Sequence, residues 1–146
     1  MNWEPSRADH SIDRATASIV LAQHLDVNTF DEVIVAGRKA AAAQHLMDRV
    51  DLVDPLELPV AQTGAVIDMA RMPPRRVVFR RLDADKVSVD ELSIGSLRIA
   101  FGTIRYGRWG DFFGRFKACL SALEATYPIT QSVRTVRLEY RFEART

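Results

Sequence analysis

One series of seven apolar residues constrains the fold more than any other feature of this sequence. Its members are Trp109, Phe112, Phe113, Phe116, Leu120, Leu123 and Tyr127. They stand at i, i+3, i+4, i+7, i+11, i+14 and i+18, which places them all on one side of an α-helix. Pro128 ends this helix because proline cannot continue one. Such a helix must pack its apolar side against another layer of structure. Cys119 lies beside the series, so we expect a buried, unreactive thiol.

The segment 136–143 alternates between apolar and charged residues, which is typical of a β-strand with one buried face. The apolar members, which we expect to be buried, are Val136, Leu138, Tyr140 and Phe142. The charged members, which face the other way, are Arg137, Glu139, Arg141 and Glu143.

Further elements are predicted from shorter patterns. Residues 15–22 form an apolar, β-branched strand. Residues 29–47 form a helix that begins at a capping box of Thr29 and Glu32, in which each side chain bonds the backbone amide of the other. Gly37 weakens this helix by about 1 kcal/mol relative to alanine.

A hairpin is predicted from residues 75–82 and 87–89, with an aspartate-rich turn between them. Residues 97–101 form another strand. We expect residues 1–12 to be a loose arm. The proline-interrupted segment 48–74 is expected to be a loop that crosses the surface, with room for a short strand near 64–69.

These elements predict one α+β domain over residues 1–146. The expected architecture is a mostly antiparallel sheet of four to five strands with two helices packed on one face, because that arrangement buries both helices. The composition, 47% hydrophobic and 27% charged, is that of a folded protein. A single cysteine, no secretion signal and no apolar run of the ~20 residues that cross a bilayer indicate a cytoplasmic protein without a membrane partner.

No catalytic, metal-binding or cofactor-binding motif is recognisable in the sequence. The three histidines share no helical or strand register, and the glycines of residues 107–114 lack the spacing of a phosphate or dinucleotide loop. Paired carboxylates such as Asp83 with Asp85 and Asp90 with Glu91 are assigned to turns. These features favour a protein that is not an enzyme and has no cofactor.

Charge is divided unevenly along the chain. Residues 1–70 hold five basic and eleven acidic side chains, a net charge of −6, whereas residues 71–146 hold fifteen and eight, a net charge of +7. The basic half can seat an acidic partner or nucleic acid, or the two halves can neutralise each other within the fold or across a dimer. The candidate partner-binding residues are Arg75, Arg76, Arg80, Arg81, Arg137, Glu139 and Arg141.

Three short motifs are similar to those of a sporadically distributed, uncharacterised bacterial family. They are Val87-Ser88-Val89, the helix start Tyr106-x-x-Trp109-x-x-Phe112, and the closing strand from Arg134 to Tyr140. The resemblance covers residues 14–143 and supports the expected fold. It departs at Glu139 and at Arg141-Phe142. Members of the family continue into a second, β-rich half, so the resemblance implies that this half is absent here or is supplied by another chain.

We therefore expect a non-enzymatic interaction or assembly protein. The closing strand would pair with a second copy, giving a homo-oligomer, or with a partner chain. One alternative is nucleic-acid binding through the arginine-rich strands. Another is an enzyme or small-ligand binder with a pocket between helix and sheet, for which Tyr106, Trp109 and Tyr140 are the candidate lining residues.

Overall fold

A six-stranded sheet forms the centre of the computed structural model, which describes residues 10–53 and 75–144. Every pair of neighbouring strands is antiparallel. The strands are β1 (His10–Leu21), β2 (Asp48–Val53), β3 (Arg75–Leu82), β4 (Ser88–Gly95), β5 (Arg98–Thr103) and β6 (Val133–Ala144). Their order across the sheet is β2-β3-β4-β5-β1-β6, so β1 lies between β5 and the last strand of the chain.

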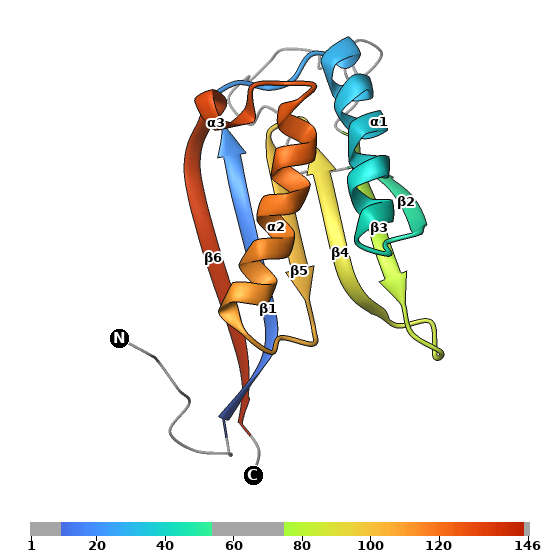
Figure 1. The fold of residues 1–146 in the computed structure, drawn as a ribbon, viewed down its shortest axis with the longest axis vertical. Coiled ribbons are helices and arrows are strands. Elements are labelled where there is room, and N and C mark those ends of the chain that lie inside the picture. The colour runs from blue at the N-terminus through green and yellow to red at the C-terminus, as the bar shows by residue number, and fades with distance from the viewer. Residues whose placement is uncertain (1–9, 54–74, 145–146) are drawn as a thin grey trace, which may run out of the picture.

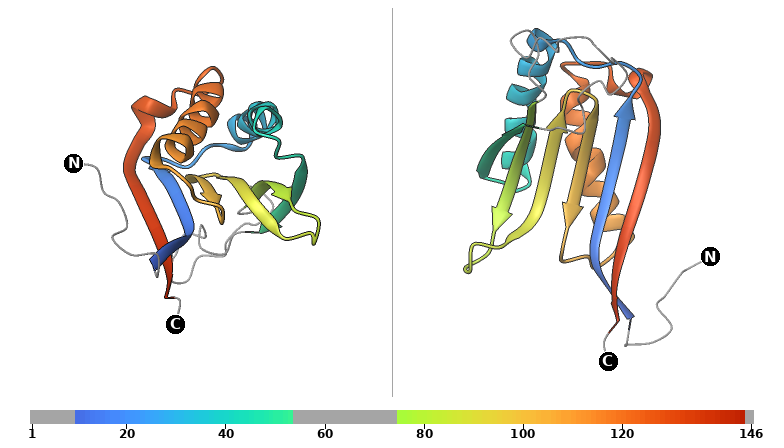
Figure 2. Two further views of the ribbon diagram at one scale, coloured as in Figure 1. Left: turned by 60° about the horizontal axis from the view of Figure 1, so that its bottom comes forward. Right: turned by 180° about the vertical axis from the view of Figure 1, so that it is seen from behind.

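Two long helices cover one face of this sheet, as Figures 1 and 2 show. They are α1 (Val27–Ala43) and α2 (Trp109–Glu124), and the four-residue α3 (Ile129–Ser132) leads into β6. The opposite face carries no described helix (Figure 2, right). The predicted α+β class, with two helices on one face of an antiparallel sheet, is confirmed. The sheet has six described strands rather than the expected four to five, because β2 adds a strand at one edge.

The core lies between the helices and the sheet. Its largest fully buried side chains include Phe101, Phe116, Leu92, Ile94, Ile99 and Leu123. The apolar series of the second helix supplies Phe112, Phe116 and Leu123 to this core. Cys119 is also buried there, as predicted.

Some local predictions are wrong. Residues 48–53, expected in a loop, form the edge strand β2, because they pair along their whole length with β3. His10 to Ile12, expected in a loose arm, belong to β1, where their partners are residues 142–144 of β6. Residues 1–9 and 54–74, including the short strand suggested near 64–69, lie outside the described residues.

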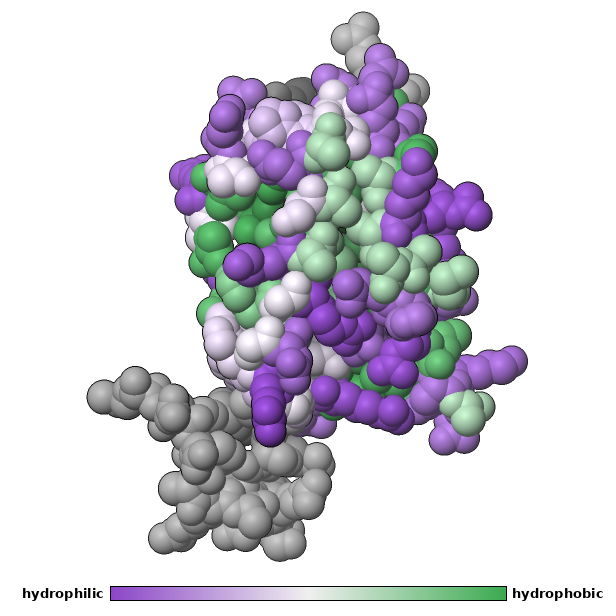
Figure 3. Space-filling view, in the orientation of Figure 1, coloured by the Kyte–Doolittle hydropathy of each residue, from purple (hydrophilic) through white to green (hydrophobic). Residues whose placement is uncertain are grey.

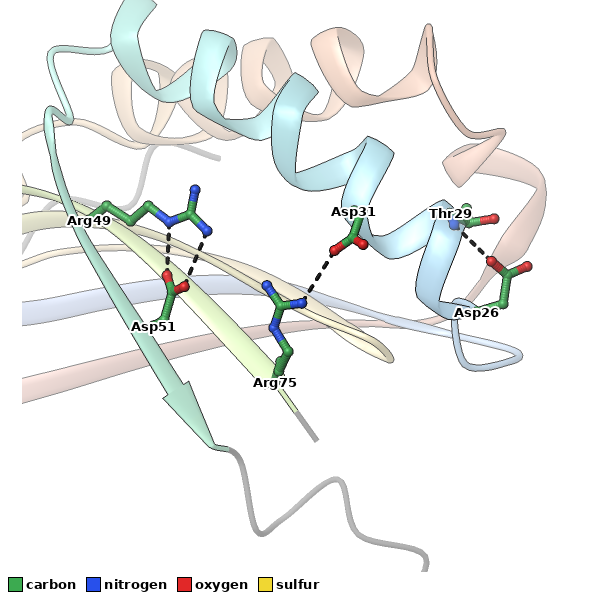
Figure 4. A network of polar contacts seen from close by, with 6 residues as sticks. All are labelled: Asp26, Thr29, Asp31, Arg49, Asp51 and Arg75. Atoms are coloured by element: carbon green, nitrogen blue, oxygen red, sulfur yellow. Dashed lines mark hydrogen bonds and ion pairs between the residues drawn. The ribbon is translucent and has the colours of Figure 1, made fainter. Parts of the chain in front are cut away.

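The predicted capping box is also wrong. The first helix begins at Val27, and Asp26 accepts a hydrogen bond at 2.7 Å from the Thr29 amide (Figure 4). Thr29 therefore lies within the first turn of the helix, and Asp26, not Thr29, is the N-cap residue. The aspartate turn is confirmed, since the Asp83 carboxylate accepts from the amides of Asp85 and Val87, each at 2.9 Å.

Gly37 lies where the first helix approaches the sheet. A Cβ at this position would clash with Cδ1 of Ile94, which is fully buried on β4. The glycine thus allows a close approach of α1 to the sheet, and this packing explains why a residue with poor helix propensity stands there.

Candidate assembly surface

The last strand, β6, occupies one edge of the sheet. It pairs with β1 over its whole length, with Val136 opposite Ile19, Leu138 opposite Ala17 and Tyr140 opposite Ala15. These β1 residues are buried under the helices, so the three β6 side chains lie on the helix side of the sheet. Among the described strands, none pairs with the outer edge of β6.

The apolar side chains of β6 are exposed. The exposed fractions are 60% for Val136, 44% for Leu138 and 37% for Tyr140. The prediction that this face is buried is therefore wrong for these three residues; the side chain of Phe142 lies outside the description. The reason is that α2 lies over β1 and β5 and leaves the edge strand uncovered (Figure 1).

We call the outer backbone edge of β6 together with Val136, Leu138 and Tyr140 the β6 surface. Figure 3 shows hydrophobic side chains gathered between α2 and β6 on the helix side of the molecule. In other proteins, a contiguous apolar surface beside an exposed strand edge is often a protein–protein contact site.

The three aromatic residues proposed to line a pocket form a cluster at the start of α2. The rings of Tyr106 and Tyr140 meet edge to face with centroids 5.6 Å apart. Phe112 contacts both Tyr106, at 5.8 Å, and Trp109, at 6.2 Å. Burial, with the neighbouring Tyr106, raises the pKa of Tyr140 above its ordinary value. Trp109 is 41% exposed, so the cluster extends the apolar surface beside β6.

The other side of β6 carries charge. Arg137 and Glu139 approach to 3.4 Å along the strand, and Arg98 of β5 lies 3.9 Å from Glu139. Arg141 stands opposite Arg14 of β1, with both side chains exposed. The edge strand is thus apolar on the helix side and mixed in charge on the opposite side.

The four arginines of β3 do not form one surface. Phe79 and Val77 of β3 face the helices, so Arg75 and Arg81 share that side and Arg76 and Arg80 point to the other. Arg75 pairs with Asp31 at 3.3 Å (Figure 4), Arg80 with Asp48 at 2.6 Å and Arg81 with Asp90 at 2.8 Å. This arrangement supports charge pairing within the fold more than phosphate binding.

Among residues 10–53 and 75–144, the most enclosed charge belongs to Asp90, which is 1% exposed on the helix side of β4. Its Oδ2 accepts from Nε of Arg81 and lies 3.2 Å from Nη1 of Arg115 on α2. Burial alone would raise the pKa of Asp90, but the Thr103 side chain and both guanidinium groups outweigh it, so the pKa lies below its ordinary value. Arg115 also bonds Gln44 at the end of α1. The cluster therefore joins the sheet to both helices.

The sequence alone did not reveal the contacts of Asp90 with Arg81 and Arg115, because Asp90 was assigned to a turn. The signal was present in β4, where Asp90, Leu92 and Ile94 alternate with Glu91 and Ser93. An aspartate in register with two core residues points inward and needs a cationic partner.

A hollow of about 330 Å³ lies on the helix-free face of the sheet. Its floor holds small residues such as Ala100 and Gly102, and Arg14, Arg76 and Arg98 contribute to its lining. It is thus on the opposite side of the sheet from the aromatic cluster of Tyr106, Trp109 and Tyr140.

Within residues 10–53 and 75–144, no group of three or more histidine, cysteine, aspartate or glutamate residues is placed to hold a metal ion. Burial raises the pKa of the Cys119 thiol to about 11. No helix in the described part of the chain is long and apolar enough to span a membrane.

Comparison with known proteins identifies no relative. No protein-family model matches the sequence, and neither the curated proteins nor the solved structures contain a match.

Proposed function

We propose that this chain is a non-enzymatic assembly protein that acts by joining another protein chain at its β6 surface. The observation that carries the proposal is an edge strand of twelve residues whose outer edge has no described partner and whose helix-side residues Val136, Leu138 and Tyr140 are exposed.

An edge strand presents a row of unpaired amide and carbonyl groups that another strand can use. In β6 these groups adjoin three exposed apolar side chains, so a partner strand gains hydrogen bonds and apolar contact together. Monomeric proteins usually protect such edges with short strands or with charges that point inward. The helix side of β6 has neither protection between Val136 and Tyr140.

The opposite edge of the sheet provides a contrast. Strand β2 has six residues, half the length of β6. Its helix side carries Arg49 and Asp51, which pair with each other at 2.8 Å (Figure 4), and the exposed Val53 at the end of the strand. A short edge with charges on its helix side is a poorer template for strand addition, so β6 is the favoured edge.

A matched pair of substitutions tests the proposal. Val136 of β6 and Val35 of α1 are the same residue type and both are 60% exposed. We expect light scattering after size exclusion to give a mass above the 16.4 kDa of one chain for the wild type and for Val35→Lys. Val136→Lys should weaken the assembly because a lysine on an edge strand opposes strand addition. A wild-type monomer at about 100 μM, or equal effects of both substitutions, would overturn the proposal.

A further inference from the structure

We infer that the partner at the β6 surface is a second copy of this chain, paired antiparallel with the first about a two-fold axis at Leu138. This inference rests on the proposed function and specifies its partner. It follows from the order of side chains along β6 and from the symmetry of a strand that pairs with itself.

A two-fold axis perpendicular to the sheet keeps the helix sides of both copies on the same side. Directly opposite residues of an antiparallel pair then share a face, so each possible axis lies midway between one residue of β6 and the same residue of the second copy. With the axis at Leu138, this residue faces Leu138 of the second copy and Val136 faces Tyr140. All three exposed apolar residues of β6 thereby gain an apolar neighbour across the interface.

The charged residues of β6 favour the same register. With the axis at Leu138, Arg137 faces Glu139 of the second copy, and this pair occurs twice by symmetry. Arg137 and Glu139 already lie 3.4 Å apart within one strand, so the interface gathers four charges that alternate in sign. Opposite charges directly across an antiparallel pair stabilise it, and like charges destabilise it.

Neighbouring registers lack this match. An axis at Arg137 sets two arginines opposite each other. An axis at Glu139 sets two glutamates together and Arg137 against Arg141. An axis at Tyr140 does oppose Glu139 to Arg141, but it pairs only residues 136–144, whereas the axis at Leu138 pairs residues 133–143. The Leu138 register therefore combines charge complementarity with the longest strand pairing.

Charge reversal with rescue tests the pairing between Arg137 and Glu139. We expect Arg137→Glu and Glu139→Arg each to weaken the dimer by about tenfold or more, because each replaces two attractive pairs with two repulsive ones. The double variant R137E/E139R should restore the wild-type dissociation constant, measured by analytical ultracentrifugation. Arg141→Glu is the control, since Arg141 faces Thr135 in this register.

Single cysteines in a Cys119→Ala background test the register directly. Residues directly opposite in an antiparallel pair bring their Cβ atoms close to disulfide distance. We therefore expect Leu138→Cys to form a disulfide-linked dimer under mild oxidation, and Glu139→Cys to do so with Arg137→Cys but not with itself.

The outcomes separate the two proposals. If the dimer persists and is weakened by Val136→Lys, but Tyr140→Cys or Glu139→Cys cross-links to itself, the register is wrong and the proposed function stands. Failure of the double variant to rescue would likewise overturn the register alone. A wild-type chain that stays monomeric would overturn both.

Discussion

At the scale of single residues, Asp90 is the charged side chain that is buried among the described residues. It is 1% exposed and its Oδ2 is held by Arg81 of β3 and Arg115 of α2. Arg115 in turn lies over the Phe101 ring, 5.0 Å from its centroid, and bonds Gln44. Removing the carboxylate charge would leave two guanidinium groups facing each other without an anion between them.

We expect Asp90→Asn to lower the free energy of unfolding by about 2–3 kcal/mol, as measured by urea denaturation at neutral pH. Because the folded-state pKa of Asp90 is lowered, its contribution is present above the unfolded carboxyl pKa of about 3.9. That contribution is lost as the pH falls through the folded-state pKa.

The pH dependence provides the internal check of this prediction. The wild-type chain should lose more stability than Asp90→Asn between neutral pH and the lowered pKa of Asp90. Asp85→Asn, in the exposed turn, serves as the control and should cost less than about 0.5 kcal/mol. Equal acid sensitivity of the wild type and Asp90→Asn would show that the carboxylate carries no charge-dependent stability.

At the scale of elements, Gly37 of α1 and Gly114 of α2 differ in how closely other side chains pack against them. We expect Gly37→Ala to destabilise the fold by about 1 kcal/mol, because its Cβ would press on buried Ile94 and this outweighs the gain in helix propensity. Gly114→Ala should stabilise by about 0.5–1 kcal/mol, since nothing lies within 4 Å of a Cβ there. Thermal unfolding of both variants measures the difference, and a stabilising Gly37→Ala would contradict this packing.

The spacing of apolar residues predicted most of the helices and strands, because the formation of each depends mainly on its own residues. The apolar series of the second helix and the alternation of β6 are local signals, and both elements form over these residues, although α2 ends at Glu124 and so stops short of Tyr127. Strand β2 was missed because residues 48–53 become a strand by pairing with β3, a contact that local sequence does not reveal.

The candidate site was only partly predictable for a similar reason. Alternation along β6 reveals that Val136, Leu138 and Tyr140 share a face, but not whether a helix covers that face. Coverage depends on the strand order, which places β6 at the edge beyond β1 and thus outside the reach of α2. The arginines of β3 were grouped in sequence, yet alternation divides them between two sides of the sheet.

At the scale of the whole molecule, the sheet has two unlike edges. The β2 edge is short and carries an ion pair, whereas the β6 edge is long, apolar on one side and charge-alternating on the other. In the proposed dimer one sheet continues through both copies, and the helices of both lie on the same face. The β2 strands then become the outer edges of the joined sheet.

Hydrogen exchange measured at low and high protein concentration tests most directly whether β6 is the assembly edge. Amides of β6 that point away from β1 lack a described partner in the single chain and gain one on strand addition. The account predicts that peptides from residues 133–144 exchange more slowly as the concentration rises, whereas peptides from residues 48–53 do not change. Exchange in β6 that is independent of concentration, or protection that appears at β2 instead, would contradict it.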